Sequence, residues 1–220
     1  MVFVVGSPRS GTTFLAGAVG SITGFVDLTE VTPIKAAIPA LSRLAPPLAA
    51  PRIRTVLERV RLLALARGLR GVEQTPETAY VLEAALTAYP QARALHIIRD
   101  GRDVACSLLD LGWLSVARHD ADDAGLSYGS SARFWVESGR EREFVTVSDA
   151  TRVAWAWRRY VTAARSVQSD RVLEAAVRRT RRGSRRHCCT GRGVPWRLGC
   201  RCARGGLSSC PRSLDRSLSS

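Results

Sequence analysis

The sequence predicts an α/β fold in which helices flank a parallel sheet. Two short apolar runs, at residues 2–5 and 94–98, have the length and composition of buried strands. Each run is followed by a glycine-containing turn and then by a segment whose apolar residues recur at helical spacing. Strands that alternate with helices along a chain pair in parallel, because the helix carries the chain back across the sheet.

The remaining elements follow from the same reasoning. Apolar residues at helical spacing, bounded by glycine or proline, predict helices over residues 12–20, 52–68, 77–89, 102–111 and 149–168. Five prolines make residues 25–51 loop-like, and aspartates and glycines make residues 113–147 irregular. Residues 171–174 have the pattern of a further strand as it begins. No internal repeat is present.

Size and composition indicate one globular domain with a tail. The chain has 220 residues, of which 45% are hydrophobic, which is enough for a core of its own. No apolar run approaches the ~18 to 20 residues of a membrane helix, so we expect no transmembrane segment. Met1 leads directly into the first strand without a basic stretch or a cleavage site. We therefore expect no secretory signal and a cytoplasmic protein.

The positive charge of the chain is concentrated at one end. The net charge is +14, yet residues 1–174 carry 21 basic and 18 acidic side chains. Residues 175–220 carry 12 arginines and one acidic residue. Lys35 is the only lysine of the chain. The first 174 residues are therefore close to neutral, and their charge does not predict a nucleic-acid partner.

The last 46 residues have the composition of neither a strand nor a helix. They hold five of the six cysteines, without a CxxC pair, so we expect no zinc site. The excess of arginine over lysine indicates a GC-rich gene, and such a gene translated out of frame gives this composition. We therefore divide the chain into an α/β domain over 1–174 and a disordered or out-of-frame tail over 175–220, which leaves the C-terminal part of the fold incomplete. The alternative is a disordered basic arm that binds nucleic acid.

The first motif is the segment Gly6–Thr13, with the sequence GSPRSGTT, between a predicted strand and a predicted helix. Its two glycines permit a tight turn, and the turn directs backbone N–H groups toward an anion at the helix N-terminus. The spacing matches a Walker loop, but Thr12 occupies the lysine position and Arg9 supplies the positive charge. The loop is therefore suited to an oxyanion other than a Mg-bound triphosphate. The alternatives are a turn without a ligand and a P-loop kinase.

The second motif comprises Arg99, at the carboxyl end of the second predicted strand, and Ser107, eight residues later. The carboxyl ends of parallel strands border the ligand crevice of an open α/β sheet. An arginine and a serine there can hold a phosphate, because the guanidinium group offers several donors in one plane. The alternative is that Arg99 pairs with Asp100 or Asp103 and that Ser107 lies on a helix surface.

The two motifs together resemble those of the PAPS-dependent sulfotransferases, where PAPS is 3′-phosphoadenosine-5′-phosphosulfate. The first is similar to the 5′-phosphosulfate loop of that family, and the second to its 3′-phosphate site. Between them, Glu73-Gln74-Thr75-Pro76 resembles the K-T-P segment of the family. The resemblance covers residues 2–174 and is closest to the bacterial and Golgi-type branch. It implies a P-loop-like α/β fold.

The resemblance also implies roles for individual residues. The residues that it assigns to the 5′-phosphosulfate are Arg9, Ser10, Gly11, Thr12 and Thr13. It assigns Arg99 and Ser107 to the 3′-phosphate, with Arg102 as an additional candidate. A glutamate base after the first helix falls on Glu30, with Asp27 as the second candidate. Gln74 stands where the family often has lysine, and a neutral amide stabilises developing negative charge less than a cation does.

The reaction implied by the resemblance is transfer of a sulfuryl group from PAPS, a co-substrate, to a hydroxyl or amine of an acceptor, without a metal. The acceptor class stays open among carbohydrate, lipid, peptide and small molecule, as does the oligomeric state. A sulfotransferase-like protein that binds but does not turn over is a further alternative. His119 is a rival base, whereas His96 lies in a hydrophobic strand and is expected in the core. The aromatic candidates for an acceptor pocket are Trp113, Phe134, Trp135, Trp155, Trp157 and Tyr160.

Overall fold

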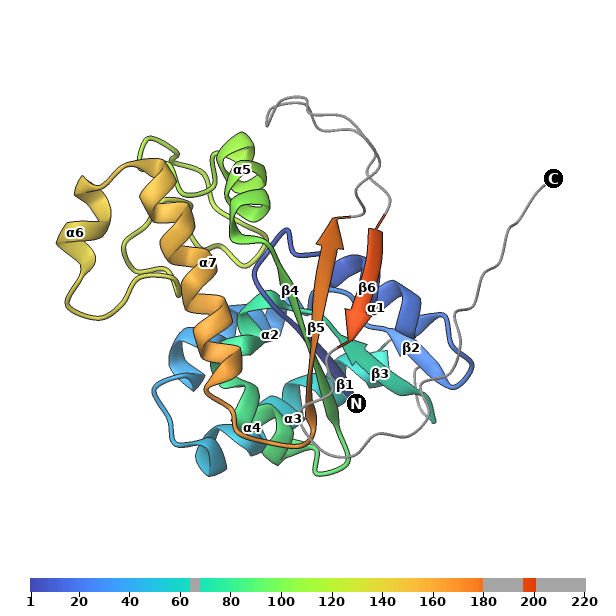
Figure 1. The fold of residues 1–220 in the computed structure, drawn as a ribbon. Coiled ribbons are helices and arrows are strands. Elements are labelled where there is room, and N and C mark those ends of the chain that lie inside the picture. Colours follow the sequence, from blue (N-terminus) through green and yellow to red (C-terminus); the bar gives the residue numbers. More distant parts are fainter. Residues whose placement is uncertain (64–67, 180–195, 201–220) are drawn as a thin grey trace.

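The computed structural model describes residues 1–63, 68–179 and 196–200. These residues form an α/β fold, as the sequence predicts (Figure 1). The strands are β1 (Val2–Val5), β2 (Phe25–Asp27), β3 (Arg70–Glu73), β4 (Arg93–Arg99), β5 (Val172–Arg179) and β6 (Trp196–Cys200). The helices are α1 (Thr12–Gly20), α2 (Thr32–Leu41), α3 (Pro46–Leu63), the 3₁₀ helix η1 (Pro76–Val81), α4 (Leu82–Ala88), α5 (Gly101–Leu111), α6 (Glu141–Thr146) and α7 (Asp149–Arg165).

The sheet has the strand order β2-β3-β1-β4-β5-β6. The first five of these strands pair in parallel, and β6 pairs antiparallel with β5. In the pairing of β1 with β4, Val5 lies opposite His96, and β4 continues for three more residues to Arg99. The turn after β1 therefore lies beside the last residues of β4, where Gly6 approaches Ile97, and the two turns that carry the sequence motifs leave the sheet from neighbouring strands.

Helices cover both faces of the sheet. On one face, Val4 packs with Leu15 and Ala16 of α1. On the other face, Phe3 and Val5 belong to a larger cluster with residues of α2, α3, α4 and α7. Figure 1 shows α1 on the side of the sheet away from α2, α4 and α7. Burial on both faces explains why β1 is a continuous apolar run rather than an alternating one.

The segment 25–51, expected to be a loop, instead contains β2, α2 and the start of α3. The prediction was wrong because prolines are tolerated in the first helical turn, where the backbone N–H has no helical partner. Pro33 occupies such a position in α2, and α3 begins at Pro46. Pro39 and Pro51 lie inside helices. The strand β3 was also missed, because its sequence, Arg-Gly-Val-Glu, is not an apolar run.

The other predicted elements are present with shifted ends. The predicted helix over 77–89 is the 3₁₀ helix η1 followed by α4, and α7 ends at Arg165. Gly112 ends α5 with a positive φ of 62°, as expected for a C-terminal glycine. Strand β5 continues through Arg179, past the predicted boundary at residue 174, because the alanines and the valine after that position extend its pairing with β4. Of the predicted tail, residues 175–179 of β5 and 196–200 of β6 are described, and the other residues that the two hypotheses concern lie outside the described ranges.

The contact between β1 and β4 predicts a specific cost for a side chain at Gly6. A Cβ atom there would lie 2.5 Å from the backbone oxygen of Ile97 and 3.0 Å from its Cγ2. We expect Gly6→Ala to lower the free energy of unfolding by about 1 to 3 kcal/mol, the usual cost of overpacking, in urea denaturation. Gly17→Ala is the matched control, because its Cβ would meet only a side-chain oxygen at 3.9 Å. Helix propensity makes that control neutral or stabilising by up to about 1 kcal/mol. Equal stability of the two variants would contradict the tight approach.

Candidate functional site

The loop between β1 and α1 has the backbone shape of an anion cradle. Arg9 has a φ of 68° and Gly11 a φ of 99°, both in the left-handed region, and the N–H of Ser10 donates to the backbone oxygen of Ser7 at 3.1 Å. Such a turn directs successive N–H groups to one side, where the positive end of the α1 dipole adds to them. The Ser10 hydroxyl is buried and has no hydrogen-bond partner within the described chain. A buried hydroxyl without a partner is what an anion site needs before its ligand binds.

The second motif meets this loop directly. The Arg9 Nε donates to the Ser107 Oγ at 2.9 Å, and the Arg99 Nη1 donates to the backbone oxygen of Arg9 at 3.0 Å. The two motifs, 98 residues apart at Arg9 and Ser107, therefore form one continuous site. The Arg99 Nε also lies 3.8 Å from a carboxylate oxygen of Asp103, so the ion pair considered from the sequence is present as well.

Arg102 lies at the start of α5 and is engaged by Asp100. The Asp100 side chain accepts from the backbone N–H of Arg102 and pairs with its guanidinium group at 2.7 Å. These bonds and that charge lower the pKa of Asp100 to about 2. The Arg102 side chain is 91% exposed. Its clearest role is to support the N-terminal cap of α5.

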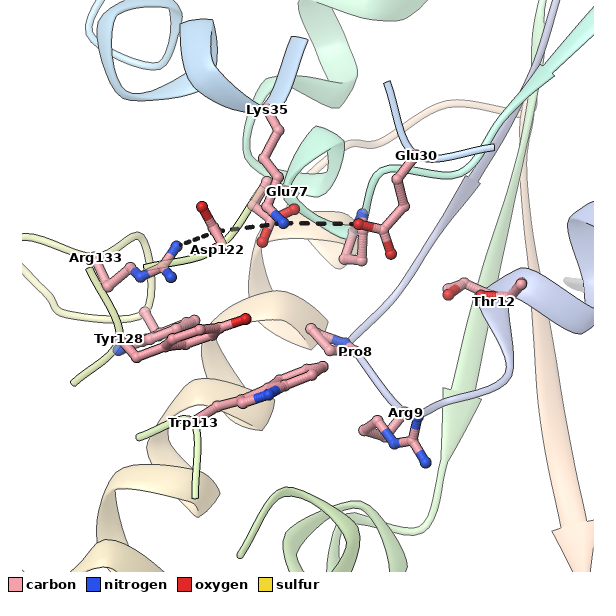
Figure 2. A pocket seen from close by; sticks show the side chains of 13 residues that line it. Pro8, Arg9, Thr12, Glu30, Lys35, Glu77, Trp113, Asp122, Tyr128 and Arg133 are labelled. Carbon is pink, nitrogen blue, oxygen red and sulfur yellow. Dashed lines mark hydrogen bonds and ion pairs between the residues drawn. The ribbon is translucent and has the colours of Figure 1, made fainter. Parts of the chain in front are cut away.

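A pocket of about 120 Å³ adjoins the loop (Figure 2). One side consists of Pro8, Arg9, Thr12 and Thr13, from the loop and the start of α1. The opposite wall carries Glu30, Lys35, Pro76 and Glu77, and the third wall carries Trp113, Asp122, Tyr128, Arg133 and Trp135. The loop with its neighbour Arg99 is thus positively charged, whereas the facing wall is rich in carboxylates.

Glu30, the predicted base, points into this pocket and is 39% exposed. Burial raises the pKa of Glu30, and the positive charge of Lys35 opposes that rise. A carboxylate with a raised pKa is a better proton acceptor when it is ionised. Asp27, the second candidate, is used locally, since its Oδ1 accepts from the backbone N–H of Thr29 at 2.8 Å.

The segment that resembles K-T-P follows β3 and is buried. The Thr75 N–H donates to Glu73 at 2.7 Å, and the Thr75 hydroxyl accepts from the N–H of Val31 at 2.9 Å, next to the predicted base. Burial raises the pKa of Glu73 to about 7. Gln74 is also buried, and its Oε1 has no hydrogen-bond partner within the described residues. This segment therefore anchors the loop that carries Glu30.

Five pocket residues were not predicted from the sequence: Lys35, Glu77, Asp122, Tyr128 and Arg133. Lys35 lies on α2, in a stretch that the prolines made loop-like, so nothing in the pattern placed it near the site. Glu77 is fully buried, accepts from the Tyr160 hydroxyl at 2.9 Å, and has a pKa raised by that burial. Its position immediately after the segment resembling K-T-P was the signal that could have identified it.

The third wall is built from the irregular segment after α5. The rings of Trp113 and Tyr128 stack with centroids 6.0 Å apart. Arg133 pairs with Asp122 at 2.7 Å, and both side chains are at least 95% buried. Two backbone oxygens of the same segment, those of Leu126 and Ser127, accept from the other guanidinium nitrogens of Arg133. Of the six aromatic candidates, Trp113 and Trp135 line the pocket, and Tyr160 lies in the core.

The two histidines within the described residues, His96 and His119, lie in different environments. His96 is 1% exposed in β4, and burial lowers its pKa to about 4, in agreement with the predicted core position. His119 is exposed on the segment after α5. Cys106 is half-buried on α5.

The described residues contain neither a candidate metal site nor a helix that could span a membrane. No group of three or more His, Cys, Asp and Glu side chains among them could hold a metal ion. None of their helices is both long enough and apolar enough to cross a membrane.

Comparisons with known proteins give similarity in structure only. No family model matches the sequence, and no curated protein matches it. Among solved structures, the chain is similar to the sulfotransferase domain from the curacin biosynthetic pathway, with a TM-score of 0.48 and 13% identity over 80% of this chain. It is also similar to the sulfotransferase domain of the Synechococcus PCC 7002 olefin synthase, with a TM-score of 0.44 and 15% identity over 80% of this chain. The chain spans 66% and 65% of those two domains, just under two thirds.

The buried pair between Arg133 and Asp122 predicts a large effect on stability. Arg133→Ala leaves the buried Asp122 carboxylate with Lys35, at 3.3 Å, as its remaining cation, and leaves two backbone oxygens without their donor. We expect it to lower the free energy of unfolding by about 3 kcal/mol in urea denaturation. Arg102→Ala, which breaks an exposed pair, is the control and should change stability little. If the two variants are equally stable, the pair does not hold the third wall.

Proposed function

We propose that the chain is a PAPS-dependent sulfotransferase. The observation that carries this proposal is the convergence of two anion-binding motifs on Arg9, through its bonds with Ser107 and Arg99. PAPS carries two separate anionic groups, a 5′-phosphosulfate and a 3′-phosphate, and a ligand of that kind needs two adjacent oxyanion sites. A pocket with a carboxylate base on its far wall adjoins these sites.

In this proposal the 5′-phosphosulfate lies in the loop formed by Arg9, Ser10, Gly11, Thr12 and Thr13. Backbone N–H groups and the α1 N-terminus supply donors without loss of side-chain entropy. The 3′-phosphate lies against Arg99 and Ser107. The Ser107 oxygen accepts from Arg9, which leaves its own O–H to donate to the phosphate.

The proposed reaction is an in-line displacement at sulfur. The acceptor oxygen, or nitrogen, forms a bond to sulfur while the bond from sulfur to the 5′-phosphate oxygen breaks. The electron pair of that bond leaves with adenosine 3′,5′-bisphosphate, and the acceptor proton passes to a Glu30 oxygen. A base so placed typically contributes ~10²- to 10⁴-fold. The chain's other contributions are orientation of the two reactants and stabilisation of charge.

Because Gln74 is neutral, the positive charge that a lysine would supply at this position must come from another part of the site. The leaving oxygen develops negative charge, and a neutral amide stabilises it weakly. Arg9 lies in the loop itself, and the positive end of the α1 dipole lies beside it, so we assign this stabilisation to them. The acceptor enters between the loop and the wall of Trp113 and Tyr128. Carbohydrate, lipid, peptide and small-molecule hydroxyls all remain candidates for it.

Calorimetric titration with adenosine 3′,5′-bisphosphate in the absence of Mg²⁺ tests the proposal. We expect binding by the wild type and a loss of about 10- to 100-fold in affinity in Arg99→Ala, because a charged hydrogen-bonding group contributes ~1.5 to 3 kcal/mol. Ser107→Ala should weaken binding less. Arg93→Ala is the matched control, because Arg93 is the exposed arginine at the other end of β4.

The possible outcomes separate the alternatives. Thermal melting of each variant checks that the fold survives, since Arg99 also bonds the Arg9 carbonyl. Equal weakening by Arg93→Ala and Arg99→Ala would mean that the effect is one of general charge. If the folded wild type does not bind the bisphosphate but binds ATP only in the presence of Mg²⁺, the proposal is wrong and a kinase-like function takes its place.

A further inference from the structure

The only lysine of the chain stands at the centre of a carboxylate cluster. The Lys35 Nζ lies 2.8 Å from Asp123, 3.3 Å from Asp122 and 3.7 Å from Glu30. Its side chain is only 10% exposed. Burial alone would lower the pKa of Lys35, but the surrounding carboxylates, Glu77 foremost, raise it, so the group stays charged. Burial of a long ammonium side chain is costly without such partners.

The carboxylates around Lys35 come from separate parts of the chain. Glu30 precedes α2, whereas Asp122 and Asp123 belong to the segment after α5 that forms the third wall. Asp123 also accepts from the Thr32 hydroxyl at 3.0 Å, which is a second link to the first turn of α2. Figure 2 shows the Lys35 ammonium between Glu30 and Asp122, joined to both by dashed lines. One ammonium group thus connects two walls of the pocket.

We propose that Lys35 is a positioning residue that holds the Glu30 carboxylate and docks the Asp122–Asp123 turn against α2, so that it assembles the acceptor side of the pocket. This inference rests on the proposed sulfotransferase function, in which Glu30 accepts the acceptor proton. Lys35 itself need not touch either reactant. Its distance from Glu30, 3.7 Å, is that of an ion pair rather than of a hydrogen bond, which leaves the carboxylate oxygens available to the acceptor.

Lys35 favours the ionised form of Glu30, whereas most of the other charged groups that face Glu30 are carboxylates and oppose it. Lys35 approaches from α2, Asp122 and Asp123 from the segment after α5, Glu77 from η1, and Arg9 lines the same pocket. Arg133 already pairs with Asp122. Without Lys35, Glu30 would lie partly buried beside other carboxylates. Both the loss of solvation and the repulsion between like charges favour its protonated form. The pKa of Glu30 would then rise further, and a larger fraction of this proposed base would carry a proton at a given pH.

The test is the titration of the Glu30 carboxyl by ¹³C NMR, together with the pH dependence of kcat/KM. Lys35→Met should raise the pKa of Glu30 by about one pH unit or more and move the acid limb of the rate profile upward by the same amount. Lys35→Arg keeps the charge and should restore most of the wild-type profile. Asp123→Asn removes a like charge and should lower the pKa of Glu30. A purely structural role would reduce activity in all three variants without these opposite shifts.

The outcomes distinguish this inference from the proposed function. Calorimetry with adenosine 3′,5′-bisphosphate should give similar affinities for the wild type and Lys35→Met, because Lys35 lies outside the two anion sites. If the wild type binds and Glu30 titrates identically in both, the positioning role is wrong while the proposed function stands. If the wild type does not bind, the proposed function fails, and the inference fails with it. Should Lys35→Met not fold, an unshifted Glu30 titration in Asp123→Asn overturns the inference.

Discussion

The parallel pairing of β1 with β4 is the contact on which the rest of the site depends. It places the turn after β1 beside the last residues of β4 and brings Gly6 so close to Ile97 that no side chain fits between them. Only at this approach does the Arg9 side chain reach Ser107 while Arg99 reaches the Arg9 carbonyl. Two turns that are unrelated in sequence thereby become one surface. Parallel α/β sheets commonly place their ligands at such an edge.

Arginines gather at the two turns, whereas the carboxylates lie on the other walls of the pocket. The edge formed by the two turns carries arginines and the N-terminus of α1, which suits it to an anionic donor. The other two walls of the pocket carry Glu30, Glu77 and Asp122, balanced by Lys35 and Arg133. In this arrangement Glu30, the proposed base, pairs with Lys35 and not with the arginines of the two turns. The same arrangement makes the buried cations structural, because each of them offsets carboxylates that would otherwise repel one another.

The predictions succeeded where local pattern and packing agree. Strand β4 and helices α1 and α5 lie within a residue of their predicted ranges, because apolar periodicity and glycines define them. The predictions were wrong over residues 25–51, because a segment with prolines at the starts of its helices has the composition of a loop. The anion motifs were recognisable because each is local in sequence. The Lys35 cluster was not, because its carboxylates come from segments about 90 residues apart, and only tertiary structure brings them together.

The most direct measurement is a crystal structure of the protein with adenosine 3′,5′-bisphosphate. We expect the 5′-phosphate in the loop formed by residues 9–13 and the 3′-phosphate against Arg99 and Ser107. We also expect Glu30 to face the open pocket beyond the 5′-phosphate. A bisphosphate bound with its 3′-phosphate away from Arg99 and Ser107, or bound outside the β1–β4 edge, would contradict the claim that the two motifs form one site.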